Sequence, residues 1–283
     1  MKSSNRIRTV RKTTGEVVAF SEDKLTRSLV RSGASKTQAQ TIVARILPML
    51  EEDTTTQQIY KRAFALLRKE QGYMASKYKL KKALFELGPT GFPFEIFIGE
   101  VLSHMGYNTQ VGVQLQGHCV THEVDVLALK EGHVSMVECK FHSDQSRTCD
   151  VKIPLYIKAR FDDLTASGIH HQPGDITEGW VVTNTRFTKD AEQYGTCVGL
   201  RLLSWDFPKG NSLKDIIEQF GLHPLTCSTM LTKAEKQMLL DEKMVLSRDV
   251  LKHTSLLDKI GIRAPRKNRI LNELAYLSNL TQV

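Results

Sequence analysis

Two largely apolar runs lie near the middle of the chain, at residues 121–129 and 134–140. Between them, Glu131-Gly132 is typical of a two-residue hairpin turn. A loop of that length makes Lys130 face His133 across the two strands. The pattern therefore predicts a β-hairpin with a defined register, and the register decides which side chains share a face.

That register brings together three charged residues from the two strands. Counting outward from the turn, Asp125 falls opposite Glu138, and Lys140 lies on the same face one step further along. Directly opposed carboxylates repel each other and destabilise a strand pair unless a cation lies between them. Acids and lysines are also depleted from strand interiors. A loop of three or five residues would instead put the two acids on opposite faces, and a hairpin with two solvated acids is the alternative.

The arrangement favours a divalent metal site. Mg²⁺, or Mn²⁺ in its place, prefers carboxylate and water oxygens and keeps open positions for a substrate phosphate. We therefore expect Asp125 and Glu138 to hold the ion. Lys140 beside them is suited to stabilise developing charge on phosphorus or to position a water.

Before this hairpin, the spacing of apolar residues is mostly helical. A short N-terminal hairpin is expected over Val10–Phe20, with Ser21 as the cap of the helix that follows. Apolar stripes then predict helices around Leu25–Val30, around Ile42–Leu50, at 59–67 behind a capping box at Thr54–Gln57, and over Tyr73–Leu87. Another helix is expected from Phe92 to Met105, where Glu95 borders the apolar face and Glu100 points away from it as a solvated acid.

Beyond the central hairpin, the pattern predicts a helix at 155–164, strands at 181–182 and 200–203, and a turn and helix between those strands. The order α-β-β-α-β-α-β fits a mixed sheet with helices on both faces. The last residues predict a helix over Leu213–Phe220, two helices capped by Thr232 and Ser247, and a fourth over Pro265–Leu280.

These elements divide the chain into three expected domains in an α+β / α/β multidomain fold. Residues 1–87 form a small helical domain with an N-terminal hairpin, residues 88–210 a mixed sheet flanked by helices, and residues 211–283 a small all-helical domain.

The charge of the 283-residue chain follows the same division. Residues 1–85 hold 18 Lys and Arg against 7 Asp and Glu, residues 86–210 hold 10 against 16, and residues 211–283 hold 11 against 8. A basic first segment suggests an anionic partner such as a nucleotide or a nucleic-acid backbone. An acidic middle segment suits a metal centre better than a bare DNA groove.

Composition also excludes some classes of protein. No apolar run approaches the length of a membrane span, and the five cysteines form no C-x-x-C pair. We therefore expect reduced thiols in a cytoplasmic protein. The sequence contains no G-x-x-x-x-G-K-[ST] loop, so any bound nucleotide is expected to regulate rather than to be hydrolysed at a P-loop.

Asp125, followed after the turn by Glu138-Cys139-Lys140, resembles the D…(D/E)-x-K core of the PD-(D/E)xK nuclease superfamily. The most similar branch is the Mrr-like restriction endonucleases. Gly91–Tyr107 resembles the first helix of that branch with its acidic residue, and Trp180–Ala191 resembles its later strand-turn-helix. Val124 stands where the superfamily name has proline.

This resemblance implies a Mg²⁺-dependent endonuclease that hydrolyses phosphodiester bonds in DNA, with a restriction-endonuclease-like fold. Asp125 and Glu138 would hold the metal, Lys140 would assist the attacking water or the transition state, and Glu95 would complete the catalytic set. The alternative is a catalytically silent, nucleotide-responsive regulator that binds DNA on a nuclease-like fold. The intact acid-acid-lysine set favours the enzyme.

The first segment carries, in order, Val10-Arg11-Lys12, Gly15, Phe20, Lys24-Leu25, Thr56, Ile59-Tyr60, Ala75 and Tyr78. This series resembles the ATP-cone, the nucleotide-sensing module of ribonucleotide reductases and their repressor. The resemblance implies that ATP or dATP binds as a regulatory ligand at Val10, Lys12, Lys24 and Thr56, with both lysines on phosphates. Thr13 stands where the family has a basic residue, which leaves affinity and the choice between ATP and dATP open. The alternative is a basic helical domain that binds DNA or joins partners.

Near the C-terminus, Leu256–Ile262 resembles a helix-hairpin-helix, a motif in which backbone N–H groups meet a DNA phosphate. The basic residues that follow it are Arg263, Arg266, Lys267 and Arg269. The alternative is a helical packing or dimerisation element. We expect DNA and an adenine nucleotide as partners, and a homo-oligomer.

Overall fold

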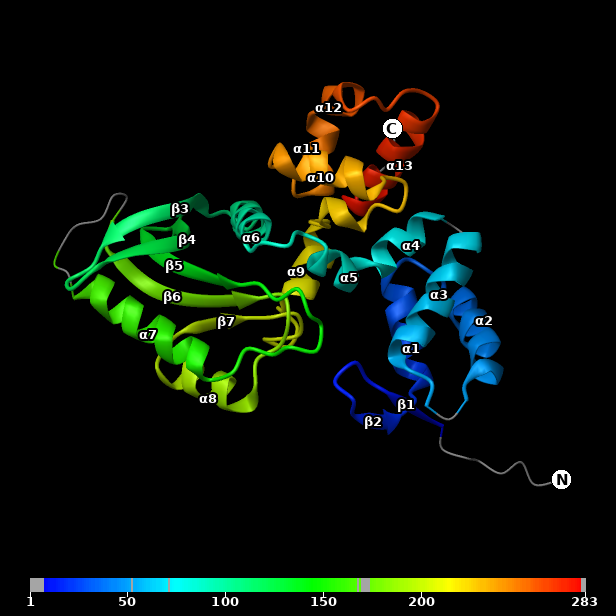
Figure 1. Ribbon diagram of the computed structural model, residues 1–283, viewed down its shortest axis with the longest axis horizontal. Helices are drawn as coiled ribbons and strands as arrows, with labels where there is room; N and C mark the ends of the chain where they lie inside the picture. Colours follow the sequence, from blue (N-terminus) through cyan, green and yellow to red (C-terminus); the bar gives the residue numbers. More distant parts are fainter. Residues whose placement is uncertain (1–7, 52, 71, 167, 169–173, 281–283) are drawn as a thin grey trace.

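The computed structural model describes residues 8–280 except 52, 71, 167 and 169–173. In Figure 1 the sheet lies to the left, the C-terminal helices lie at the top, and the N-terminal hairpin and helices lie at the lower right. Among the described residues, no helix is both long and apolar enough to cross a membrane.

The N-terminal segment contains the predicted hairpin and five α-helices. Its elements are β1 (Thr9–Arg11), β2 (Val17–Ala19), α1 (Glu22–Arg31), α2 (Lys36–Ile46), a 3-10 turn (Leu47–Met49), α3 (Thr56–Glu70), α4 (Gly72–Tyr78) and α5 (Leu80–Phe85). Ser21 caps α1 as predicted, because its side chain accepts a hydrogen bond from the Lys24 N–H.

Two details of that segment correct the sequence-based expectations. The capping box of α3 is formed by Thr55 and Gln58, one residue later than expected. The helix expected over Tyr73–Leu87 is two helices, because the chain tightens at Lys79, whose N–H donates to the carbonyls of both Ala75 and Ser76. The Lys79 ammonium reaches inward instead, to Glu86 at 2.5 Å and to the Thr226 carbonyl at 2.7 Å.

The middle segment is a five-stranded mixed sheet with the order β3-β4-β5-β6-β7. Its elements are α6 (Phe92–His104), β3 (Asn108–Gln116), β4 (Thr121–Lys130), β5 (His133–Lys140), α7 (Lys152–Thr165), β6 (Ile176–Thr183), α8 (Lys189–Cys197) and β7 (Arg201–Leu203). The first three strands pair antiparallel, and β5, β6 and β7 pair parallel.

Strand β3 is absent from the sequence-based element order, which is therefore one strand short. It is an edge strand whose residues are mostly exposed or half-buried, so its apolar side chains at Val111, Val113 and Leu115 give only a weak alternating signal. Gly112, with a positive φ, interrupts the strand.

The two faces of the sheet carry different helices. Val126 and Val137 belong to the core that includes α6, whereas Leu127 and Met136 belong to the core that includes α7 and α8. Since side chains alternate along a strand, Glu138 lies on the same face as Met136, the α7 face. On β4 the alternation is interrupted at Asp125, because Val124 belongs to the α7 core and Val126 to the α6 core. The C-terminal helices extend the α6 core, so both faces of the sheet are covered.

The C-terminal segment contains five helices rather than the expected four. They are α9 (Leu213–Phe220), α10 (Lys233–Asp241), α11 (Ser247–Lys252), α12 (Ser255–Lys259) and α13 (Arg266–Leu277), with a 3-10 turn at Leu225–Cys227. The bounds of α9 and the Thr232 cap agree with the prediction. The cap of α11 is Leu246, one residue before the expected Ser247. Helix α13 packs on the N-terminal segment, where the Tyr276 hydroxyl donates to the Ser32 carbonyl at 3.1 Å.

Candidate active site

The turn between β4 and β5 is the predicted two-residue loop. Glu131 and Gly132 both have positive φ, 52° and 82°, as a type I′ hairpin turn requires. Strand pairing starts at Lys130 opposite His133 and continues to Val126 opposite Val137. The predicted register is therefore confirmed over this ladder.

The two acids come directly after the last of these pairs. In place of a further ladder bond, the Asp125 carboxylate accepts a hydrogen bond from the Cys139 N–H, with 2.7 Å between Oδ2 and N. Glu138 on β5 is half-buried and its side chain leans toward α7. The end of the hairpin thus holds the two carboxylates near each other.

Helix α7 adds a cation, Arg160, to this pair of acids. Arg160 is 8% exposed, and its Nη1 donates to Glu138 Oε2 at 2.5 Å. Its Nη2 donates to the Glu123 carbonyl, and Tyr156, one turn earlier on α7, lies under the guanidinium. The only signal in the sequence is the four-residue spacing of Tyr156 and Arg160 on a helix.

The fourth predicted residue, Glu95, lies in the first turn of α6. Burial, together with the charges of Asp125, Glu123 and Glu138, raises its pKa to about 7. Those neighbours place Glu95 beside the hairpin acids although α6 packs on the other face of the sheet. Glu100 is half-buried rather than solvated as expected, because α6 also packs on the C-terminal segment, and burial near Asp249 raises its pKa.

The acids share one electrostatic environment. Burial raises the pKa of Glu138 to about 7, repulsion from Asp125 adds to the effect, and Arg160 opposes it. Burial also raises the pKa of Asp125, which the Cys139 N–H and Arg160 partly offset. Carboxyls with raised pKa values mark a site with too little positive charge, and a bound cation would remove that deficit.

The donor set fits one type of ion. Among the described residues, no three His, Cys, Asp or Glu side chains are grouped closely enough to hold a metal together. Two carboxylates with room for water and phosphate are the usual protein contribution to a Mg²⁺ site, so Asp125 and Glu138 fit Mg²⁺ or Mn²⁺.

Lys140 ends β5 and is exposed, while its main chain is firmly held. Its carbonyl accepts from the Thr183 hydroxyl at 2.8 Å. The fully buried Asn184 accepts from the His142 N–H at 3.0 Å and donates to the His142 carbonyl at 2.8 Å. Asn184 was not singled out from the sequence, although it lies in the strand-turn-helix stretch that carried the family resemblance.

The four residues predicted to contact a nucleotide lie in the N-terminal segment. Arg11 of β1 bridges to Thr55, which brings the hairpin to the start of α3, where Thr56 is the first residue. Val10 is buried in the core of this segment, and the Lys12 ammonium contacts Glu16 at 2.8 Å. Lys24 lies in the first turn of α1 and lines a separate cavity described below.

The basic residues near the C-terminus contact the protein itself. Arg266 makes two hydrogen bonds to Glu235, at 2.5 and 2.7 Å, and Lys267 lies 2.6 Å from Asp258. Arg263 also contacts Asp258. These ion pairs favour the packing interpretation of α12 and α13, while DNA binding through a helix-hairpin-helix stays a prediction.

Two comparisons with known proteins bear on this geometry. Residues 89–206 match the restriction endonuclease (Mrr-type catalytic) family, and residues 223–278 match the C-terminal domain of AF1548-like proteins. An uncharacterised protein of Archaeoglobus fulgidus is 33% identical over 181 residues, which cover 62% of this chain and 97% of that protein. The chain belongs to the AF1548-like family. Within it, the middle segment is a restriction-endonuclease-like domain of a nuclease family.

The chain is also similar to two solved structures. The crystal structure of AF1548, a protein of unknown function, is 29% identical with a TM-score of 0.56, covering 67% of this chain and 99% of that chain. The MspJI restriction endonuclease in complex with a 27-mer oligonucleotide is 13% identical with a TM-score of 0.34, covering 70% of this chain and 39% of that one. Both matched family regions of the AF1548-like chain begin after residue 88, so neither bears on the ATP-cone resemblance.

Proposed function

We propose that this chain is a metal-dependent DNA endonuclease whose catalytic residues are Glu95, Asp125, Glu138 and Lys140. The observation that carries the proposal is the pair of carboxylates at the end of the β4-β5 hairpin, inside the region that matches restriction endonucleases. The raised pKa values of Glu95 and Glu138 support a site that takes up a cation.

Each residue has a defined task in this proposal. Asp125 and Glu138 hold Mg²⁺ or Mn²⁺, which when bound supplies a Lewis acid for the scissile phosphate and its attacking water. The Cys139 N–H fixes the Asp125 carboxylate, and Arg160 fixes Glu138. Lys140 extends into solvent from a rigid strand end, where it can stabilise negative charge on phosphate oxygens.

Supercoiled plasmid tests this proposal. Incubated with Mg²⁺ or Mn²⁺, the chain is expected to produce nicked or linear DNA, and EDTA is expected to stop the reaction. Asp125→Asn and Glu138→Gln should abolish cleavage with an unchanged circular dichroism spectrum, because neutral amides bind Mg²⁺ poorly. Glu131→Gln, in the exposed turn of the same hairpin, is the matched control and should cleave normally.

The alternative function, a silent DNA-binding regulator, makes the opposite prediction. Wild type and Asp125→Asn would then shift labelled DNA equally in a gel and neither would cleave it under any metal. Calorimetric titration with Mn²⁺ separates the two functions further, since equal metal affinity of the wild type and both acid variants would refute the metal site.

We further propose that ATP or dATP binds the N-terminal segment at Val10, Lys12, Lys24 and Thr56 and regulates cleavage. The proximity of the hairpin to the start of α3 supports this site. In a thermal-shift series, ATP and dATP should raise the melting temperature more than pyrophosphate, because adenine and ribose contacts add to the phosphate contacts. Lys12→Ala should weaken this effect, whereas Lys36→Ala, on the exposed start of α2, should not. Equal shifts with all three ligands would contradict the proposal.

A further inference from the structure

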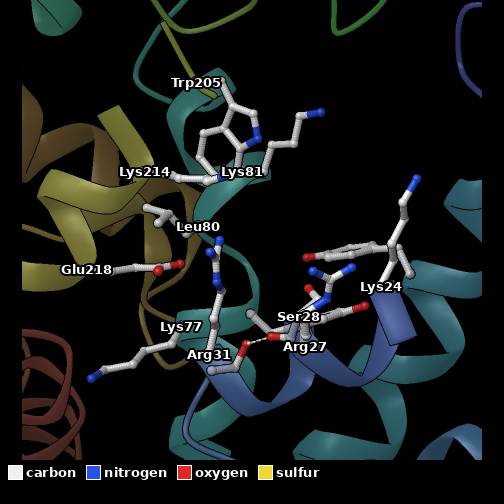
Figure 2. A pocket seen from close by; sticks show the side chains of 13 residues that line it. Lys24, Arg27, Ser28, Arg31, Lys77, Leu80, Lys81, Trp205, Lys214 and Glu218 are labelled. Carbon is white, nitrogen blue, oxygen red and sulfur yellow. Dashed lines mark hydrogen bonds between the residues drawn. The ribbon is translucent and has the colours of Figure 1, made fainter. Parts of the chain in front are cut away.

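A cavity of about 450 Å³ lies between the N-terminal segment and the residues that follow β7. One side is formed by α1, α4 and α5 together with Tyr60 of α3, and the other by Trp205 and α9. Figure 2 shows Arg31 extending from α1 toward Trp205 and Lys214 across this space. Cavities of this size are typical of small-molecule sites.

Positive charge dominates the lining. Among the described residues that line the cavity, Glu218 is the one acid, whereas the cations are Lys24, Arg27, Arg31, Lys77, Lys81 and Lys214. Three of them follow each other on α1 at spacings of three and four residues, so they share one face of that helix. Like charges at that spacing destabilise a helix, which indicates that this face is kept for an anion.

Few of these charges are neutralised inside the protein. No carboxylate among the described residues forms an ion pair with Lys24, Lys81 or Lys214, and Arg31 lies 3.9 Å from Asp215. Burial and the nearby charges of Arg186 and Lys214 lower the pKa of Lys81 to about 8 against the opposing effect of Asp206. Lys77 is occupied elsewhere, because its ammonium donates to Asn279 at 2.7 Å.

Aromatic rings form the remaining walls, and they are fixed in place. Tyr60 and Tyr78 stack with ring centroids 5.2 Å apart and planes within 7°. The main-chain N–H of Trp205 donates to the Thr185 carbonyl at 3.0 Å, and Lys81 lies over the indole ring. Rigid aromatic faces beside lysines and arginines suit a ligand with both a ring and phosphates.

We propose that this cavity binds a short chain of phosphoryl groups, as in a nucleoside triphosphate or inorganic tripolyphosphate, between the N-terminal segment and α9. The site goes beyond the nucleotide site of the proposed function, because Val10, Lys12 and Thr56 do not line the cavity and only Lys24 is common to both. Its two walls come from different parts of the chain, so a ligand there ties the N-terminal segment to the nuclease region. A concave site of this volume encloses one small anion rather than following a DNA backbone.

The test is calorimetric binding to the full chain at about 150 mM salt, with EDTA and without DNA. The probes are sodium tripolyphosphate and ATP. Arg31→Gln on α1 and Lys214→Gln on α9 should each weaken binding roughly tenfold, since each removes a charge-assisted contact. Both side chains are at least partly exposed, so the variants should fold, which thermal unfolding verifies.

Two control variants locate the site. Lys36→Gln carries the same loss of charge on the far helix α2 and should bind normally. Lys12→Gln removes a charge from the hairpin, outside the cavity, and should leave the losses caused by Arg31→Gln and Lys214→Gln unchanged. Loss of binding in Lys12→Gln together with normal binding in Arg31→Gln and Lys214→Gln would overturn the cavity and place the ligand at the hairpin.

The two probes identify the source of the phosphates. Tighter binding of ATP indicates a nucleotide whose base contacts the aromatic walls, and equal binding indicates inorganic polyphosphate; either result supports the cavity. Absence of saturable binding overturns the proposal. The proposal also fails if a short DNA duplex displaces tripolyphosphate from the wild type and this displacement requires Arg31 and Lys214. Because neither DNA cleavage nor a metal enters this experiment, its failure leaves the proposed nuclease untouched.

Discussion

The acid cluster at the end of the β4-β5 hairpin and the basic cavity each bring like charges together, negative charges in the first and positive charges in the second. At the end of the β4-β5 hairpin, crowded carboxylates receive a built-in counter-charge from the buried Arg160. In the cavity, six ammonium and guanidinium groups share fewer carboxylates, chiefly Glu218 in the lining and Asp215 near Arg31, and their helices come from distant parts of the chain. The difference suggests that Arg160 offsets part of the negative charge of the acid site before a cation binds, whereas the cavity depends more on an anion from solution.

The prediction with the largest expected effect removes Arg160, the positive charge that the protein itself supplies to the acid cluster. Arg160→Ala leaves Glu138 half-buried and unpaired, and breaking such a pair costs about 3–5 kcal/mol of unfolding free energy. Urea unfolding in EDTA should show this loss, and Mn²⁺ should restore part of it by replacing the missing positive charge. Arg201→Ala is the matched control, because Arg201 contacts Glu178 at the same 2.5 Å but is 55% exposed. It should cost less than about 1 kcal/mol. Equal losses of unfolding free energy in the two variants would mean that the Arg160–Glu138 pair contributes no more than an exposed ion pair.

The second test separates catalysis from structure within one hairpin. Lys140→Ala should reduce plasmid cleavage by on the order of 10²-fold, because a charge that stabilises the transition state is lost, while Mn²⁺ binding and the melting temperature stay unchanged. Lys130→Ala should instead lower the melting temperature and leave plasmid cleavage unchanged. The Lys130 ammonium donates to the Met105 carbonyl at 2.9 Å and lies over the Tyr107 ring, so this variant loses structural contacts. Full cleavage by Lys140→Ala would mean that the E-x-K match is accidental.

The same comparison explains how much the sequence could predict. The candidate acid site depends on one two-residue turn, so the register of the hairpin was enough to bring Asp125 near Glu138. Arg160 comes from a helix 22 residues beyond Glu138, and only packing of α7 on the sheet brings them together. Its burial could not be inferred from a helix whose apolar stripe is weak.

Sequence patterns also failed where tertiary contacts decide the local structure. The break between α4 and α5 follows from the inward turn of Lys79 toward the Thr226 carbonyl, which lies 147 residues away in the chain. Glu100 was predicted to be solvated because the sequence does not show that the C-terminal segment packs over it. The basic cavity was missed for the same reason, since Lys24 and Lys214 share no local pattern. Local elements were therefore predictable, and contacts between segments were not.

A third test uses the pH dependence of the acid cluster. The pKa of Glu95 is raised from its ordinary 4.5 to about 7, so the native state binds more protons than the unfolded state between those pH values. Stability therefore falls as pH rises through that window. Glu95→Gln should raise the melting temperature by roughly 3 °C at pH 8 and leave it unchanged at pH 4.5. Saturating Mg²⁺ at pH 8 should shrink the difference. A gain of the same size at both pH values would show that packing, not charge, is responsible.

The smallest expected effect comes from one cation in the basic cavity. The pKa of Lys81 is lowered to about 8 by burial and by Arg186 and Lys214, so its charged form is disfavoured in the folded protein at pH 7. Between pH 8 and its ordinary 10.5, the unfolded chain binds a proton that the native state lacks, and stability rises with pH. Lys81→Met should therefore raise the melting temperature by roughly 1–2 °C at pH 7, and the gain should disappear near pH 10.

Lys82→Met, on the exposed side of the same helix, is the control for that experiment and should give no gain, because Lys82 lies 3.7 Å from Glu86. Adding tripolyphosphate to the same melting measurements tests whether the cavity binds an anion. If the cavity binds it, the ligand stabilises the wild type more than Lys81→Met, and the order of the two melting temperatures reverses at saturation. If Lys81→Met is less stable than the wild type at pH 7 without ligand, the aliphatic part of the Lys81 side chain stabilises the protein by its packing. The positive charges of the cavity would then be accommodated by solvent, and the contrast with the acid cluster would fail.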